Sequence, residues 1–199
     1  MSPSKSVHVL VFDGFADWEP AHALAELRRW GKRSIRTVGF GRAPVVSMGG
    51  LEITPQVELA AVRPDDVELL ILPGGDLWES GEYPRQELEE LIVAVLAADT
   101  PVAAICAATL ALGRAGVLDD RRHTSNMRTY LSERAEGYRG ADLYVEELAV
   151  RDRHVVTASG LGDVDFARAI FAELELFSAA DEQLWFDMFK HGKLPAGAV

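Results

Sequence analysis

The sequence predicts an α/β fold in which helices cover both faces of a mostly parallel sheet. Short apolar runs rich in β-branched residues alternate along the chain with longer segments of helical periodicity. The apolar runs are continuous rather than alternating, which is typical of strands buried on both faces. No repeat, low-complexity tract or long linker divides the 199 residues, so we expect one domain over residues 1–199.

In the first half of the chain, glycine and proline separate the predicted elements. Asp17 is the expected N-cap of the first helix, because Pro20 is tolerated only in a first turn. Gly49 and Gly50 supply the turn of a hairpin and nothing more. The expected strands span residues 7–13, 34–40 and 67–72, the hairpin 45–54, and the helices 16–30 and 84–98.

The second half continues the alternation of strands and helices. An apolar strand is followed by a helix of small residues that begins just after Cys106. Asp163 and Ser178 are positioned to cap the last two helices. The expected strands span residues 101–105, 122–126, 143–150 and 154–158, and the helices end near residues 115, 135 and 174, with a loop at 159–162.

Composition excludes several classes of function. The net charge of −11 and a pI near 4.9 argue against a nucleic-acid partner. No window holds the roughly 20 apolar residues that a membrane span requires. The chain opens with Met-Ser-Pro-Ser-Lys-Ser and has no apolar signal region, which predicts a cytoplasmic protein. A single cysteine excludes an internal disulfide and a thiolate-rich zinc site, and we expect neither a metal nor an organic cofactor.

Cys106 is the most informative residue, because it lies where the strand over 101–105 turns into a helix. A side chain at such a junction projects at the carboxyl edge of the sheet. The N–H groups of the following helix favour the thiolate, which predicts a lowered cysteine pKa. The alternative is a buried core cysteine that only packs.

Four loops are expected at the same carboxyl edge, where ligands of parallel sheets bind. They are residues 13–19, 73–76 and 106–108, and Asn126. Gly74 and Gly75 can turn their backbone N–H groups toward a ligand, and with the N–H of Ala107 they can form an oxyanion hole. The alternative is a simple turn. Glu19 either interacts with a helix dipole or donates a hydrogen bond to the Cys106 thiolate as a buried, protonated acid.

Three segments carry a family resemblance: Val-Leu-Val-Phe-Asp-Gly-Phe with Glu19, Leu-Ile-Leu-Pro-Gly-Gly, and Ala-Ala-Ile-Cys-Ala-Ala. From about residue 7 to 175 the chain resembles the ThiJ/PfpI superfamily. The resemblance implies a flavodoxin-like three-layer sandwich, usually a homodimer. It implies a nucleophilic Cys106 on a strained elbow paired with Glu19, and oxyanion donors at Gly74 or Gly75 and at Ala107.

The sequence departs from this family at two histidine positions. Many members have a histidine where this chain has Asn126, a residue that can bind a carbonyl oxygen but is a poor general base. His123 lies three residues earlier, so strand alternation directs it to the opposite face. The protease-like branch has a histidine directly after the cysteine, where this chain has Ala107. No later histidine is followed by the His-x-Glu spacing of glutamine amidotransferases, so a peptidase or glutaminase is not expected.

Two functions stay open at this stage. The first is an enzyme in which Cys106 attacks a small carbonyl compound, as in glyoxalase or deglycase chemistry, or a small amide or ester. The second is a redox or stress-response protein without turnover, whose cysteine is oxidised reversibly. The expected partners are a small-molecule substrate and a second copy of the chain, with Trp18 and an aromatic stripe at 185–189 as packing or dimer contacts.

Overall fold

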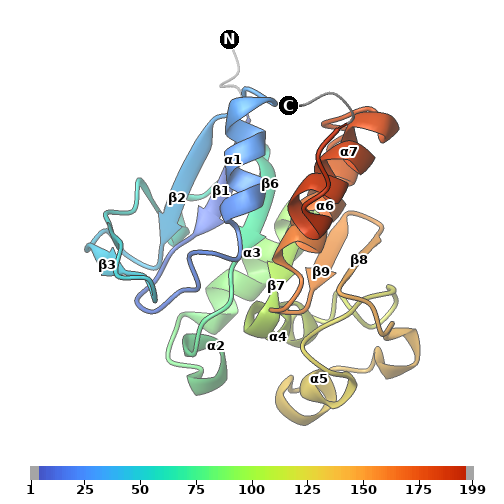
Figure 1. The fold of residues 1–199 in the computed structure, drawn as a ribbon. Coiled ribbons are helices and arrows are strands. Elements are labelled where there is room, and N and C mark those ends of the chain that lie inside the picture. The colour runs from blue at the N-terminus through green and yellow to red at the C-terminus, as the bar shows by residue number, and fades with distance from the viewer. Residues whose placement is uncertain (1–4, 196–199) are drawn as a thin grey trace.

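The computed structural model describes residues 5–195, and its core is a seven-stranded sheet between two layers of helices (Figure 1). The strand order is β5-β2-β1-β6-β7-β9-β8, and every pair is parallel except β8 with β9. The strands are β1 (Ser6–Leu10), β2 (Ile35–Gly39), β5 (Val57–Glu58), β6 (Val67–Leu72), β7 (Val102–Ile105), β8 (Ala149–Asp152) and β9 (Val155–Ala158). The predicted three-layer α/β fold is confirmed.

Helices cover both faces of this sheet. The α-helices are α1 (Ala21–Arg29), α2 (Leu77–Ser80), α3 (Arg85–Ala97), α4 (Thr109–Arg114), α5 (Arg128–Arg134), α6 (Asp163–Glu173) and α7 (Ala179–His191). Helices α1, α6 and α7 lie in front of the sheet in Figure 1, and α3 and α4 lie behind it. Short 3-10 turns occupy Leu59–Ala61, Pro64–Asp66, Cys106–Ala108 and Ala141–Leu143.

The central strands are buried on both faces, as their continuous apolar runs predict. In β7, Val102 and Ala104 face the core formed with α3 and α4, while Ala103 and Ile105 face the core formed with α1 and α6. All four side chains are fully buried. The strand that leads to Cys106 is therefore fixed from both sides.

The topology brings the candidate loops together. The chain runs from β1 outward to β2, then returns to place β6 on the other side of β1. A switch in strand order therefore lies between β1 and β6, and crevices at such points bind the ligands of open α/β sheets. The segments that follow β1, β6 and β7 all emerge at this edge because the three strands are parallel.

The segment between β1 and α1 differs from the prediction. The strand ends at Leu10, and α1 begins at Ala21 with Pro20 at the N-cap position and no side-chain cap. Asp17 as an N-cap is therefore wrong. Its carboxylate instead accepts a hydrogen bond from the Ser47 hydroxyl at 2.6 Å. A contact with a residue 30 positions away has replaced the local one.

That contact docks the hairpin β3 (Val45–Val46) and β4 (Glu52–Ile53) against the loop after β1. Gly50 has a φ of +84° and makes the turn. Gly49 has a further role, because a Cβ there would overlap the Asp17 carboxylate. The expectation that both glycines serve only the turn is thus wrong for Gly49.

The predicted strand at 122–126 is also wrong. His123 makes a single bridge to Tyr144, and the next N–H, that of Thr124, donates to the Thr157 hydroxyl at 2.9 Å. The Thr157 side chain therefore accepts the hydrogen bond that the backbone of a neighbouring strand would otherwise accept. The strand predicted at 143–150 is reduced to β8, and Asp163 is the first helical residue after Gly162 rather than the cap itself.

The C-terminal helix begins as predicted, since the Ser178 hydroxyl accepts a hydrogen bond from the N–H of Asp181 at 3.2 Å. Its aromatic residues pack largely within the chain. Trp185 is 7% exposed and meets Phe171 edge to face at a centroid distance of 4.7 Å. Within residues 5–195, no helix combines the length and apolarity needed to cross a bilayer.

The layer between α6 and the sheet predicts where truncation is costly. Ile170 is fully buried in that layer, so Ile170→Ala should lower the free energy of unfolding by about 2–5 kcal/mol. Leu161 is 83% exposed, and Leu161→Ala should change the free energy of unfolding by less than about 0.5 kcal/mol. Urea denaturation of both variants measures the difference. Equal losses would contradict this packing.

Candidate functional site around Cys106

Cys106 lies directly after β7 in a conformation that side chains rarely adopt. Its φ is +60°, a left-handed value that costs a non-glycine residue about 1 kcal/mol or more. The Thr109 hydroxyl donates to the Cys106 carbonyl at 2.7 Å and also pairs with the Ser125 hydroxyl at 2.7 Å. These bonds hold the turn between strand and helix, and with it the direction of the thiol.

Glu19 lies beside the thiol and is 1% exposed. The N–H of Gly74 donates to its Oε2 atom at 2.5 Å. A Cβ added at Gly74 would lie 2.7 Å from that oxygen and 2.8 Å from the Cβ of Cys106. Gly74 therefore does more than make a turn: its missing side chain leaves room for the carboxyl group and the cysteine together.

A second glycine closes the other side of this pair. A Cβ at Gly160 would lie 2.9 Å from Sγ of Cys106 and 3.3 Å from Oε1 of Glu19. The N–H of Gly160 donates at 3.0 Å to Oδ1 of Asn126. That bond fixes the amide so that Nδ2 of Asn126 faces the sulfur and donates to it at 3.4 Å. Asn126 thus contacts the thiol itself.

The electrostatics of the thiol are opposite to the prediction. Burial and the Glu19 carboxylate raise the pKa of Cys106 to about 11. The Asn126 amide and the Ala107 N–H favour the thiolate but do not outweigh these effects. Burial also raises the pKa of Glu19 to about 7. The expectation of a low cysteine pKa is wrong because it considered the helix N–H groups without burial and the adjacent charge.

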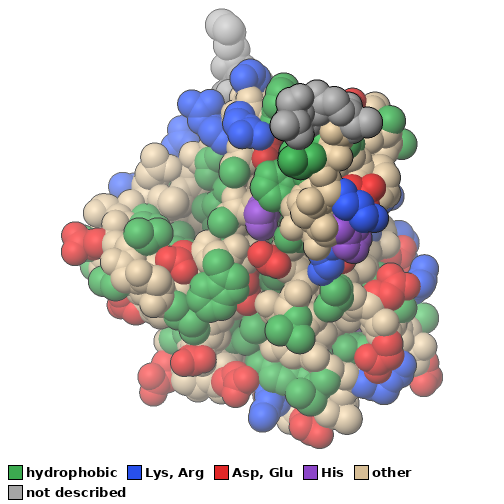
Figure 2. Space-filling view, in the orientation of Figure 1, with side chains coloured by type: hydrophobic (Ala, Val, Ile, Leu, Met, Phe, Trp, Pro, Cys, Tyr) green, Lys and Arg blue, Asp and Glu red, His purple; other side chains and the backbone are tan. Residues whose placement is uncertain are grey.

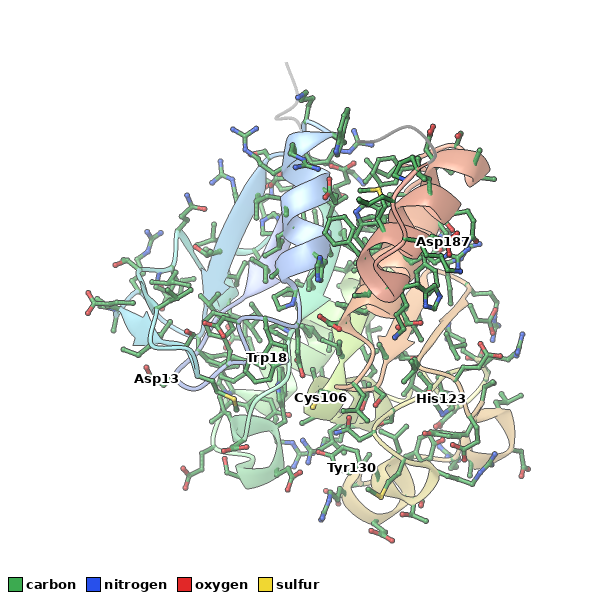
Figure 3. The ribbon with its side chains drawn as sticks, in the orientation of Figure 1. Asp13, Trp18, Cys106, His123, Tyr130 and Asp187 are labelled. Carbon is green, nitrogen blue, oxygen red and sulfur yellow. The ribbon has the colours of Figure 1, made fainter. Side chains whose placement is uncertain are left out.

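A small pocket of about 130 Å³ opens onto the sulfur. It is bordered by the loop after β1, the hairpin, the loop after β6, α2 and α5. Figure 3 shows Cys106 at the ends of the strands, with Trp18 and Tyr130 on either side. The lining residues are Ala16, Trp18, Glu19, Met48, Gly75, Asp76, Glu79, Cys106, Ala107, Asn126 and Tyr130.

The backbone donors expected from sequence are not equivalent. The N–H of Gly74 is taken by Glu19. Gly75 and Ala107 both line the pocket, and Gly75 has a φ of +150° that favours glycine. Gly75 and Ala107 thus line the pocket, whereas Gly74 is bound to Glu19, and the Ala107 N–H also hydrogen-bonds the thiol.

His123 is not part of this site. Its Nδ1 is 2.7 Å from the Arg121 carbonyl oxygen and its Nε2 is 2.6 Å from the Tyr138 hydroxyl. The ring is fully buried, burial lowers its pKa, and Figure 3 shows it well apart from Cys106. Both ring nitrogens make contacts that hold the segment before α5. A structural role therefore explains His123 better than contact with a substrate does.

Several residues around Cys106 and its pocket were not predicted from the sequence. Gly160 follows the carboxyl end of β9, so its place in a loop at that edge was a usable signal. The others had no local signal. Tyr130 donates to Oε1 of Glu79 at 2.8 Å across 51 residues, and Met48 reaches the rim only because the hairpin docks on Asp17.

Known proteins resemble this chain over most of its length. The model of the DJ-1/PfpI family matches residues 5–173. The chain belongs to this family. A family protein from Agrobacterium tumefaciens, the DJ-1 superfamily protein Atu0886, superposes with a TM-score of 0.87 at 36% identity, covering 95% of this chain and 100% of that one. A ThiJ/PfpI family protein from Bacillus anthracis gives 0.88 at 34% identity, covering 96% and 92%.

The names of the relatives point to two different activities. A Bacillus subtilis protein named uncharacterized protease YoaZ is 34% identical, covering 96% of this chain and 93% of its own length. The deglycase TK1284 of Thermococcus kodakarensis is 29% identical, covering 74% of this chain and 89% of its own. Membership of the DJ-1/PfpI family therefore leaves the reaction to be argued from the site.

The Glu19 charge predicts the pH dependence of thiol reactivity. Above pH 7 Glu19 is mostly ionised and opposes the thiolate, so Glu19→Gln should lower the cysteine pKa. We expect alkylation by iodoacetamide at pH 8 to rise roughly threefold to tenfold, the effect of half to one pKa unit. At pH 5.5 the carboxyl group is protonated and the two proteins should react alike. Glu87→Gln, on an exposed part of α3, is the control. A ratio that does not change with pH would contradict the assignment.

Proposed function

We propose that this protein is an enzyme in which the Cys106 thiol adds to the carbonyl carbon of a small α-oxoaldehyde. The observation that carries the proposal is the hydrogen-bonded pair of Glu19, which is 1% exposed, and Cys106 at the floor of a small pocket that opens onto the sulfur. A thiol, a carboxyl group and backbone donors together suit covalent addition to a carbonyl.

Glu19 has the pKa that a proton carrier needs. A group is most effective in general acid–base catalysis when its pKa lies near the working pH, and burial raises that of Glu19 to about 7. At a pH between the two raised pKa values, the pair formed by Glu19 and Cys106 carries one proton. The resting thiol holds it, and the carboxylate receives it as the sulfur attacks. The high thiol pKa is compatible with catalysis for this reason.

The reaction needs no external oxidant. The sulfur adds to the aldehyde carbon, and Glu19 passes the thiol proton to the aldehyde oxygen, which lies toward Gly75 and Ala107. The product is a hemithioacetal, and Glu19 is again a carboxylate. Glu19 then moves the proton of that carbon to the adjacent carbonyl carbon, so the first carbon is oxidised to a thioester as the second is reduced to an alcohol. Water hydrolyses the thioester to a 2-hydroxy acid and the free thiol. The net change is the addition of one water molecule.

The names of the relatives favour this reaction in part. Two of them are named deglycases, and two are named uncharacterized proteases. Hydrolysis of a small amide or ester is the enzymatic variant of the proposal. Peptide hydrolysis is less well supported, because no histidine lines the pocket described here and His123 is engaged elsewhere.

A redox or stress-response role is the second candidate. A cysteine that is oxidised to sulfenic acid needs an accessible thiolate. Burial and Glu19 raise the thiol pKa to about 11, which keeps the thiolate scarce at neutral pH. The geometry thus favours proton-coupled addition over direct oxidation.

Turnover of methylglyoxal to lactate tests the proposal. Cys106→Ser should abolish it, and Glu19→Gln should lower kcat/KM by roughly a hundredfold or more. In the wild type, kcat/KM should fall as the pH drops below about 7, because the base form of Glu19 is required. His123→Gln, outside the pocket, should retain most activity. Simple amides serve as the parallel substrate panel, and turnover that survives in Cys106→Ser would refute the mechanism.

We also propose that two copies of the chain associate. Hydrophobic side chains gather on the face of Figure 2, and Trp18 at the pocket is 49% exposed. Two-fold pairing is the commonest way to cover such a surface. Light scattering should report twice the chain mass of 21.7 kDa, and Trp18→Lys should shift the distribution toward the single chain. A wild-type mass near 21.7 kDa at all micromolar concentrations would reject this part.

A further inference from the structure

The pocket over Cys106 has an uneven distribution of charge. Its lining includes the carboxyl groups of Glu19, Asp76 and Glu79. Among the residues that line it, no lysine, arginine or histidine is present. A molecule that approaches the sulfur therefore passes acidic side chains without meeting a compensating cation. Glu19 lies at the buried floor, whereas Asp76 and Glu79 are exposed at the rim.

The fold places both acidic residues at the rim and fixes the carboxylate of Glu79 there. Asp76 follows the Pro73-Gly74-Gly75 loop at the N-cap position of α2, and Glu79 lies within α2. The Tyr130 hydroxyl on α5 donates to Oε1 of Glu79 at 2.8 Å. This bond connects two elements on opposite sides of the pocket, so the Glu79 carboxylate is fixed near the entrance rather than free to swing into solvent.

Two guanidinium groups that contact α2 and α5 are not among the residues that line the pocket. Arg134 lies over the ring of Tyr130, 5.5 Å from its centroid. Arg114 donates to the Trp78 carbonyl at 3.0 Å and to the Tyr83 hydroxyl at 2.9 Å. Both support α2 and α5 from outside the lining. They stiffen the rim and do not provide a partner for an anionic ligand.

We propose that Asp76 and Glu79 are specificity-determining residues that admit neutral or cationic small electrophiles to Cys106 and disfavour anionic ones. The consequence for catalysis rests on the proposed function: neutral α-oxoaldehydes are accepted, and α-oxoaldehydes that also carry a carboxylate are excluded. Two unit charges a few ångströms apart at a protein surface interact by enough to change a rate by about threefold to tenfold per carboxylate. Salt screens exposed charges, so the discrimination weakens as ionic strength rises.

Alkylation of the thiol tests the proposal without requiring turnover. Iodoacetamide and iodoacetate have nearly the same size, and each loses iodide as the sulfur forms a thioether. They differ in charge alone. The measured quantity is the ratio of their second-order rate constants with Cys106, compared with the ratio for 2-mercaptoethanol, a neutral thiol. A change in the cysteine pKa affects both reagents equally, so it cancels in the ratio.

The wild-type protein should prefer iodoacetamide by about tenfold more than 2-mercaptoethanol does at low salt. The double variant Asp76→Asn with Glu79→Gln should lose most of that excess, and so should the wild type in 1 M salt. Glu87→Gln with Glu90→Gln, on the exposed part of α3, removes the same net charge and should keep the excess. A wild-type ratio equal to that of 2-mercaptoethanol, or equal losses in the two double variants, would overturn the proposal.

Turnover separates this proposal from the proposed function. Turnover of methylglyoxal, which is neutral, and of 4,5-dioxovalerate, an α-oxoaldehyde that carries a carboxylate, is measured for the wild type and for the Asp76→Asn, Glu79→Gln variant. Preserved alkylation selectivity without any turnover would refute the catalytic function and leave the charge selectivity intact. Turnover with no discrimination between the two alkylating reagents would refute the charge selectivity alone.

Discussion

The site depends on one unfavourable placement, a carboxyl group buried beside a thiol, with no cationic side chain among the residues that line the pocket. Burial raises the pKa of both groups, and their mutual repulsion raises that of Cys106 further. The pair avoids the cost of two buried charges by keeping a proton between them. The thiol and the carboxyl group are thereby held in contact, and the Gly74 N–H and the Asn126 amide are the polar groups that fix their positions.

The surrounding fold serves this contact mainly by leaving room for it. Gly74 and Gly160 come from loops after β6 and β9, and a side chain at either would collide with the pair. The left-handed backbone at Cys106 adds local strain that the buried strand β7 and the Thr109 hydrogen bond sustain. Three parallel strands deliver these groups to one edge. A parallel sheet suits this purpose because the loops at the carboxyl ends of its strands meet at one edge, although they lie far apart in the sequence.

The sequence was sufficient for features that depend on local pattern. Continuous apolar runs predicted the central strands, and the junction at Cys106 predicted its position at the sheet edge. Features that depend on distant partners were missed. Asp17 has the right spacing for an N-cap, yet Ser47 binds it, and Thr157 takes the N–H that a strand at 122–126 would have used. The predicted direction of the cysteine pKa shift was wrong for the same reason. Burial and the Glu19 charge come from elements that lie far from Cys106 in the sequence.

The relatives named deglycase and protease can share one fold because the thiol alone does not choose the reaction. An amide needs a proton delivered to its leaving nitrogen, whereas an α-oxoaldehyde needs a proton moved between adjacent carbons. Glu19 lies beside the sulfur and is shielded from solvent. This position suits the transfer of a proton between two carbon atoms close to the new carbon–sulfur bond. No second acid lies deep in the pocket described here, since Asp76 and Glu79 are at its exposed rim. One buried carboxyl group with a pKa near neutrality therefore favours the isomerisation over peptide hydrolysis, and the acidic rim narrows the compounds that reach it.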